Sequence, residues 1–153
     1  MTMLQVKFRS GLTLIFSSLP SFLSVTVDSE RDADGVLQPG HRRGLEEETD
    51  RYHPMDACNP TQGSHLVGST VGKQIERVTI LKMDPASATE HDCCLEVGIK
   101  FYFTEEQPLI LAHALYEPSD TFVAIIPDLI FPEYRKRLHE YELGTLAPWE
   151  PEA

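Results

Sequence analysis

Two short clusters of polar side chains are the first candidates for chemistry in this sequence. Residues 30–35 read ERDADG, with acids at the first, third and fifth places and a glycine at the sixth, as at the start of a calcium-binding loop. Such a loop needs a glutamate at its twelfth place, where this chain has His41. Neither flank has the pattern of a helix. We interpret the segment as an acidic turn in which Asp34 and Gly35 bend the backbone.

The second cluster is His91-Asp92-Cys93-Cys94. Imidazole and thiolate suit zinc, but structural zinc sites draw four ligands from two separated pairs. The other nearby candidates have spacings that match no common zinc pattern; they are His53, Cys58 and His65. We therefore predict no metal site. Cys94 is expected to be a small buried side chain at the start of a strand, because free cysteine is often buried.

The sequence offers no catalytic constellation. A nucleophilic cysteine needs a neighbouring histidine, a lowered thiol pKa and an oxyanion hole, and six histidines make a chance pairing easy. His113 lies on the apolar side of its segment and is predicted to be a core histidine with a hydrogen-bond partner. No G-x-S-x-G, phosphate-binding loop, dinucleotide fingerprint or HExxH is present. We assign no catalytic residue and no cofactor.

The elements that would position such residues are mainly β-hairpins. Apolar and polar side chains alternate over residues 95–104, the period of a half-buried antiparallel strand. A turn at 105–108 and a second apolar segment to Leu115 complete a hairpin. Residues 11–27 read in the same way, with Pro20 corresponding to Pro108. The similarity indicates a repeated hairpin, although unrelated hairpins also converge on this pattern.

Three further elements complete the predicted fold. Residues 75–82 read as a strand rich in β-branched side chains, and residues 121–126 as a central strand. Residues 132–143 are predicted to form a helix with a proline at its start and a glycine just past its end. The predicted core consists of Leu14, Phe16, Leu23, Val25, Val78, Ile80, Val97, Ile99, Phe101, Leu111, Val123, Ile125, Leu138 and Tyr141.

Residues 28–64 differ from the rest of the chain because they are acidic and lack apolar periodicity. We interpret them as a long polar insertion loop, the first segment expected to be cleaved in limited proteolysis, and residues 145–153 as an extended tail. The sequence thus predicts one domain over 1–153. Its fold class is α+β, with antiparallel hairpins in a meander, one C-terminal helix and the acidic insertion.

The composition limits the classes of partner and the cellular location that we expect. A formal charge of −11 over 153 residues argues against binding to nucleic acid or to an anionic membrane, and favours encounter with a basic protein. Three cysteines form no disulfide framework, which indicates a reducing, cytoplasmic location. Residues 10–27 carry no charge and imitate a secretory signal, but five serines, a proline and the hairpin pattern favour the strand reading.

In its acidity, size and meander-plus-helix pattern, the chain resembles the immunity proteins with which bacteria neutralise polymorphic toxins. The resemblance rests on residues 66–143, including LVGSTVGKQIERVTILK and the hairpin after it, and involves no family-defining motif. It implies a cytoplasmic toxin inhibitor that occludes a basic toxin domain through complementary charge. From the charge of the insertion we expect contact through Asp32, Asp34, Glu46, Glu47, Glu48 and Asp50.

Two other functions are compatible with the same residues. The chain could be an accessory or structural subunit that binds a sister subunit through the apolar face of its sheet. It could also be a small ligand-binding β-domain, or an enzyme without a recognisable motif, with its pocket between sheet and loop. Self-association would favour the first alternative, and heat stabilisation by a small molecule or metal the second.

Overall fold

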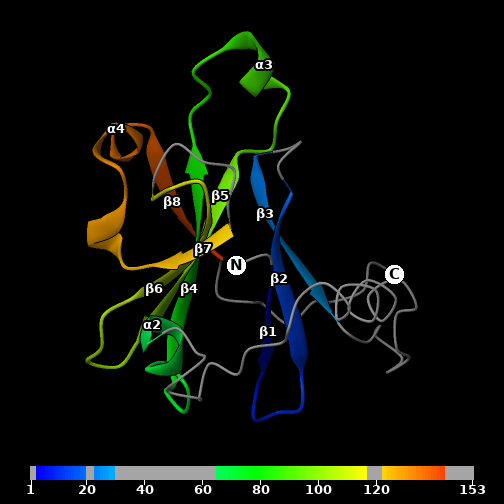
Figure 1. Cartoon of the computed structure of the whole chain (residues 1–153), viewed down its shortest axis with the longest axis vertical. Helices are drawn as coiled ribbons and strands as arrows, with labels where there is room; N and C mark the ends of the chain where they lie inside the picture. Colours follow the sequence, from blue (N-terminus) through cyan, green and yellow to red (C-terminus); the bar gives the residue numbers. More distant parts are fainter. Residues whose placement is uncertain (1–2, 20–22, 30–64, 117–121, 144–153) are drawn as a thin grey trace, which may run out of the picture.

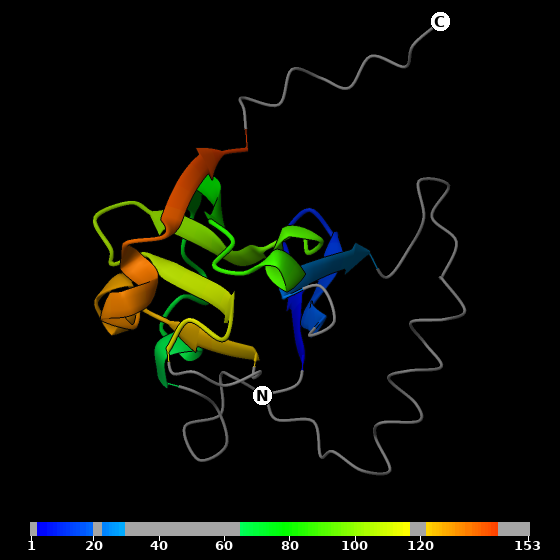
Figure 2. The same cartoon turned by 90° about the horizontal axis from the view of Figure 1, so that it is seen from above.

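The described part of the protein is a sandwich of two antiparallel sheets. The computed structural model describes residues 3–19, 23–29, 65–116 and 122–143. The smaller sheet has the order β1-β2-β3, with β1 at Met3–Lys7, β2 at Thr13–Leu19 and β3 at Ser24–Ser29. The larger has the order β7-β6-β5-β4-β8, with β4 at Ile75–Met83, β5 at Glu96–Phe103, β6 at Leu109–His113, β7 at Phe122–Ile125 and β8 at Leu138–Glu142. The blue smaller sheet lies beside the green-to-orange larger one (Figures 1 and 2).

The described helices are short and lie before or between strands of the larger sheet. They are α2 at His65–Gly68, α3 at Ala88–His91, the 3-10 turn η2 at Pro127–Leu129 and α4 at Pro132–Arg135. No helix among the described residues is long and apolar enough to cross a membrane. The predicted fold class, α+β and mainly antiparallel β, is confirmed.

The main core lies between the two sheets. Phe16 of β2 meets Phe101 of β5 edge to face, with ring centroids 5.8 Å apart and ring planes at 85°. These rings belong to one buried cluster that also contains Val25, Phe103, Leu109, Leu111 and Phe122. Burial of this much aromatic and aliphatic surface is what holds the sheets together.

A second core covers the other face of the larger sheet. Its buried members are Leu81, Met83, Leu95, Val97, Ile110, Ala112, Leu115 and Ile125. Ile130, Tyr134 and Leu138 pack against them from the η2–α4 segment and β8. The N–H of Phe131 donates to the carbonyl of Leu115 at 2.8 Å and anchors this cover.

Both predicted hairpins are present, one in each sheet. In β2–β3, Phe16 pairs with Val27, and in β5–β6, Phe101 pairs with Leu109. The two hairpins pack against each other, since β3 contacts β5 and β6. Their common origin remains a prediction. The strand predicted at 75–82 is confirmed as β4.

His113 links the two sheets from inside the sandwich. Its side chain is buried, and Nδ1 forms a short hydrogen bond with Oγ of Ser18 on β2. The expectation of a core histidine with a partner is therefore confirmed. A buried imidazole with a hydrogen bond avoids most of the cost of desolvating a polar group.

The helix predicted over 132–143 is wrong in its second half. Helix α4 ends at Arg135, and residues 138–142 form β8 instead. No apolar alternation marks LHEYE as a strand, because Leu138 and Tyr141 are three residues apart. Pairing with β4, which satisfies the backbone hydrogen-bonding groups of the segment, makes it one. Consequently Tyr141, predicted to be in the core, is 54% exposed, whereas Leu138 remains half-buried.

Smaller corrections concern element positions and burial. The segment predicted as a central strand at 121–126 contains β7, which lies at one edge of the larger sheet. Cys94 is exposed rather than buried. Strand β3 extends to Ser29, so the polar insertion begins later than position 28; its remainder and the 145–153 tail lie outside the described residues. Several predicted core residues are only half-buried, namely Leu14, Leu23, Val78, Ile80, Ile99 and Val123.

Candidate functional site

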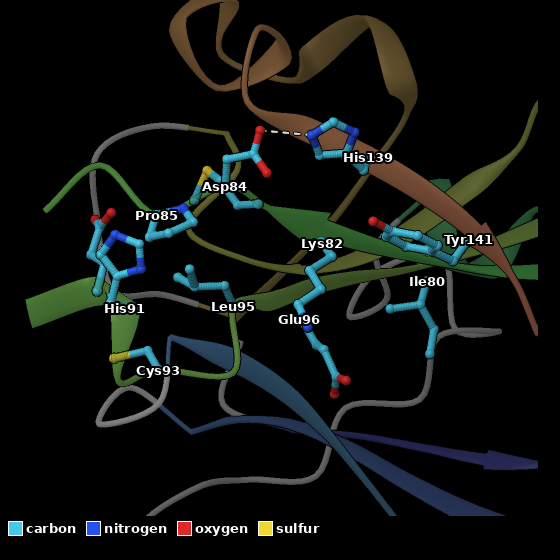
Figure 3. A pocket seen from close by; sticks show the side chains of 12 residues that line it. Ile80, Lys82, Asp84, Pro85, His91, Cys93, Leu95, Glu96, His139 and Tyr141 are labelled. Carbon is cyan, nitrogen blue, oxygen red and sulfur yellow. Dashed lines mark hydrogen bonds and ion pairs between the residues drawn. The ribbon is translucent and has the colours of Figure 1, made fainter. Parts of the chain in front are cut away.

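An open groove of about 580 Å³ lies between the β4–β8 pair and the loop that carries α3. Figure 3 shows its walls: His91 and Cys93 on one side, and Ile80 with Tyr141 on the other. The volume is within the range of ligand sites in proteins. The groove is therefore the candidate site that the described residues offer.

The sheet register explains which side chains form the floor. Directly opposite residues in an antiparallel pair share a face. Ile80 pairs with Tyr141, and Lys82 pairs with His139 on one side and Glu96 on the other. Lys82 thus lies between His139 and Glu96 in the sheet, and all three residues line the groove (Figure 3). Within the described residues, neither Lys82 nor Glu96 is in an ion pair.

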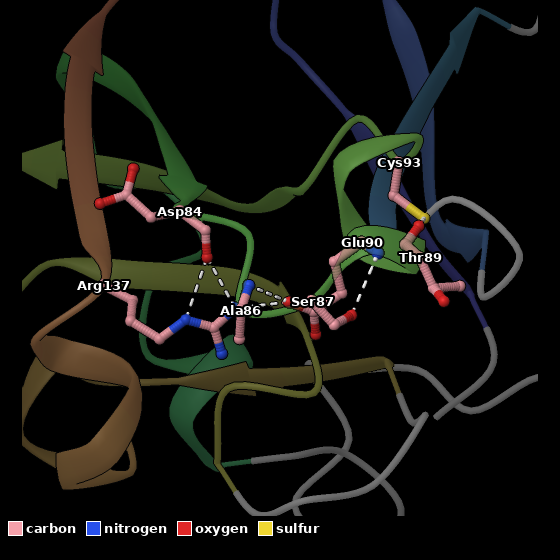
Figure 4. Close-up of polar contacts among 7 residues, drawn as sticks. All are labelled: Asp84, Ala86, Ser87, Thr89, Glu90, Cys93 and Arg137. Atoms are coloured by element: carbon pink, nitrogen blue, oxygen red, sulfur yellow. Dashed lines mark hydrogen bonds and ion pairs between the residues drawn. The ribbon is translucent and has the colours of Figure 1, made fainter.

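Two side chains, His139 of β8 and Arg137 just before it, fix the loop wall in place. His139 Nε2 and Asp84 Oδ2 are 2.7 Å apart. Arg137, just before β8, donates from Nε and Nη2 to the carbonyl of Asp84 at 3.0 and 2.6 Å, and Nη2 lies 2.7 Å from Glu90 Oε2. Figure 4 shows the Arg137 guanidinium reaching the loop. Ion-paired arginine in a fork geometry holds such a wall more firmly than a lone charge.

Helix α3 is short, and its N-terminus is capped by its own sequence. Ser87 Oγ accepts from the N–H of Glu90 at 3.3 Å, and the Glu90 carboxylate accepts from the N–H of Ala86 (Figure 4). This is close to the Ser-x-x-Glu capping box. The motif at 87–90 was the sequence signal that could have located α3 and the loop wall.

The opposite face of β8 belongs to a different polar cluster. Two cations lie over the Tyr102 ring: the guanidinium carbon of Arg77 is 4.0 Å from the ring centroid, and the Lys100 amine is 4.6 Å from it. Glu140 of β8 accepts hydrogen bonds from Thr79 Oγ1, at 2.7 Å, and from the Tyr102 hydroxyl. Its carboxylate is 3.6 Å from Lys100 Nζ.

The charge state of Glu140 follows from these neighbours. Burial by itself would raise the pKa of the carboxyl group. The hydrogen bonds from Tyr102 and Thr79, with the nearby cations of Lys100 and Arg77, outweigh burial and hold the pKa below its usual value. Glu140 is therefore ionised at neutral pH, and Glu142 pairs beside it with Arg77 at 3.3 Å.

Strand β8 thus contributes to both faces. His139 and Tyr141 face the groove, and Glu140 and Glu142 face the other way. No predicted site residue fell on this strand, because we predicted a helix there. No apolar alternation in LHEYE signalled a strand, and Tyr134, Leu138 and Tyr141 lie at helical spacing.

The residues predicted to contact a partner cannot be placed in this geometry. They lie outside the described residues and are Asp32, Asp34, Glu46, Glu47, Glu48 and Asp50. Of the second cluster, His91 and Cys93 line the groove, and Cys93 Sγ is 3.7 Å from the carbonyl oxygen of Thr89. Over the described ranges, no group of three metal-ligating side chains could hold an ion.

Comparison with known proteins gives no match: no family model, curated protein or solved structure is significantly similar to this chain.

Proposed function

We propose that the chain is a protein-binding inhibitor that neutralises a cationic protein, such as a toxin domain, by occluding it. The observation that carries the proposal is where the acidic charge resides. The described sandwich contains nine basic and twelve acidic residues, a balance of −3. The whole chain has 13 basic and 24 acidic residues, so the remaining segments hold four basic and twelve acidic residues, a balance of −8.

The sandwich uses much of its own charge internally. Five of its carboxylates form ion pairs with described lysine or arginine side chains: Glu90, Glu106, Glu133, Glu140 and Glu142. The other segments contain too few lysine and arginine residues to pair with their acidic residues in the same way. Such an excess destabilises a compact state through self-repulsion, so a cationic partner is the natural counterpart.

The physical effect of this charge is on encounter. A concentrated negative region raises the association rate with a basic partner and disfavours acidic ones. Salt screens the effect over a Debye length of about 8 Å at physiological ionic strength. The run Glu46-Glu47-Glu48 is the densest acidic stretch and is proposed to contribute most, together with Asp32, Asp34 and Asp50. The proposal places the protein in the cytoplasm.

The groove supports a second candidate, a small-ligand-binding domain. Lys82 lies in it without an ion pair among the described residues, and the Ile80 and Tyr141 side chains give it an apolar side. A ligand that fills the groove would raise the melting temperature by mass action. A thermal-shift screen of carboxylic acids with an apolar body tests this candidate, with Lys82→Met as the control variant.

The experiment for the main proposal is capture with the full chain as bait, followed by reconstitution with each purified candidate. The proposal expects a stoichiometric complex with a basic protein whose activity is lost on binding. Exclusive recovery of acidic partners, or a complex that leaves the activity of the captured protein intact, would overturn it. A self-associated bait with no other protein would favour the subunit alternative.

A further inference from the structure

We infer that the outer edge of β8 is the docking site for a strand of the cationic partner, which joins the larger sheet as a sixth strand. The inference rests on the proposed function and adds to it the place and mode of contact. Strand addition supplies affinity through backbone hydrogen bonds and specificity through alternate side chains. Three observations on β8 support it.

The first is the direction of the backbone groups. The Asp84 N–H donates to the Arg137 carbonyl at 2.8 Å, and the Leu143 N–H donates to the Val78 carbonyl at 3.3 Å. Along β8 these two hydrogen-bonded positions, 137 and 143, are six residues apart. Hydrogen bonding to one neighbouring strand recurs at every second residue, so the backbone groups of His139 and Tyr141 also point toward β4. The backbone groups of the alternate residues point outward; they belong to Leu138, Glu140 and Glu142.

The second observation is that no strand among the described residues pairs with this edge. Strand β8 ends the strand order of the larger sheet, and within the described residues nothing hydrogen-bonds to its outer side. Its side chains are accessible as well: the side chain of Glu142 is 62% exposed and that of His139 is 52% exposed. A row of free donors and acceptors is a template for another strand.

The third observation is charge. Glu140 and Glu142 lie on the outermost strand, while the cations that pair with them, Arg77 and Lys100, lie one and two strands further in. An added strand would bring its Cβ atoms about 5 Å from those of Glu140 and Glu142, one strand nearer than to that of Arg77 and two strands nearer than to that of Lys100. Basic residues on that side of the incoming strand are therefore favoured, with apolar residues on the other side beside His139 and Tyr141.

The same charges argue against a second copy as the occupant. Antiparallel pairing of β8 with itself, centred on Glu140, sets Glu140 opposite its own copy. Centring the pair on Tyr141 sets Glu140 opposite Glu142. Like charges directly opposite each other destabilise a strand pair.

Other edges of the described sheets fit a cationic strand less well. Strand β7 carries no charge, and β1 carries Lys7. Strand β3 has a single acid, Asp28, which already interacts elsewhere. Of the described edges, β8 alone presents two carboxylates in alternate positions.

The test uses a synthetic probe and the full chain. The probe is an acetylated, amidated heptapeptide of alternating lysine and valine; a glutamate–valine heptapeptide is its control. Binding is followed by amide shifts and hydrogen exchange in NMR spectra. We expect protection of the Leu138, Glu140 and Glu142 amides with the lysine peptide only.

Two variants separate the backbone from the charge. Glu142→Pro removes an outward N–H, which edge strands tolerate, and should weaken peptide binding about tenfold or more. Glu142→Gln keeps that N–H and should weaken it only a few-fold, while Glu105→Gln in the β5–β6 turn should leave it unchanged. Unshifted amides of β2 and β7, which lie away from the substituted positions, confirm that each variant is folded.

The outcomes distinguish this inference from the function beneath it. If the lysine peptide binds but leaves the β8 amides unprotected, strand addition is overturned, while the proposal that the protein binds a cationic partner still stands. Equal protection by both peptides overturns the cationic partner at this edge. Absence of binding by either peptide overturns the inference, while the proposed function still rests on reconstitution with the captured protein.

Discussion

Replacement of Phe101 by alanine tests the packing of the two sheets. Phe101 is 8% exposed, at the centre of the core between them, and its ring meets that of Phe16 edge to face. Truncating a buried phenylalanine costs about 3–5 kcal/mol, and the edge contact contributes roughly 0.5–1.5 kcal/mol beyond burial. Because the site is almost fully enclosed, we expect a loss of about 4 kcal/mol in the free energy of unfolding.

Urea unfolding followed by far-UV circular dichroism measures this loss. Leu129→Ala is the control, because Leu129 is 43% exposed and its truncation should cost less than about 1 kcal/mol. The double variant with Phe16→Ala should show a coupling of roughly 0.5–1.5 kcal/mol. A cost below about 1 kcal/mol for Phe101→Ala would mean that the faces of β5 are inverted and that the sandwich is packed differently.

Three further perturbations test other parts of the account. Gly98→Ala should destabilise by about 1–3 kcal/mol in urea unfolding, because the new methyl group would lie 3.2 Å from Ile110 and 3.3 Å from Leu81 in a closed core. Glu140→Gln should lower the free energy of unfolding at pH 7. The difference from the parent should narrow as the pH falls below 4.5, because the pKa of Glu140 in the folded protein lies below that value and the stabilisation is lost when the carboxylate is protonated. Arg137→Met should increase amide hydrogen exchange in residues 86–92, whereas Lys136→Met, at an exposed site, should not; equal exchange in both would show that the loop wall stands without Arg137.

The strands were predictable where one face of the segment is buried and the other is not. Alternation over residues 95–104 located β5, and the β-branched segment located β4. The prediction of one apolar face was correct only for Ile99, Phe101 and Phe103; Leu95 and Val97, beyond a register shift, belong to the second core. Sequence reasoning failed at β8, where Leu138 and Tyr141 are three residues apart and fit a helical stripe better than a strand pattern. Pairing with β4, a contact far away in sequence, decided between them, and local propensity has no information about such a contact.

The candidate site was less predictable than the fold. The groove depends on β8 and on the α3 loop being brought together by Arg137 and His139, across more than 45 residues of chain. The Ser-x-x-Glu motif could have placed α3, but nothing local connects it with β8. The acidic residues 46–48 were selected by charge alone, and that selection stays a prediction.

The most direct test of the proposed function is the association rate of the chain with its captured partner over a salt series. The triple variant Glu46→Gln, Glu47→Gln and Glu48→Gln is compared with the parent and with a control of equal charge change, Asp92→Asn, Glu105→Gln and Asp128→Asn, at exposed positions of the sandwich. We expect the parent rate to fall steeply with salt, and the triple variant to associate more slowly than the control while its melting temperature stays close to that of the parent. A parent rate that is flat with salt, or a triple variant as fast as the control, would contradict electrostatic capture of a basic protein through this acidic stretch.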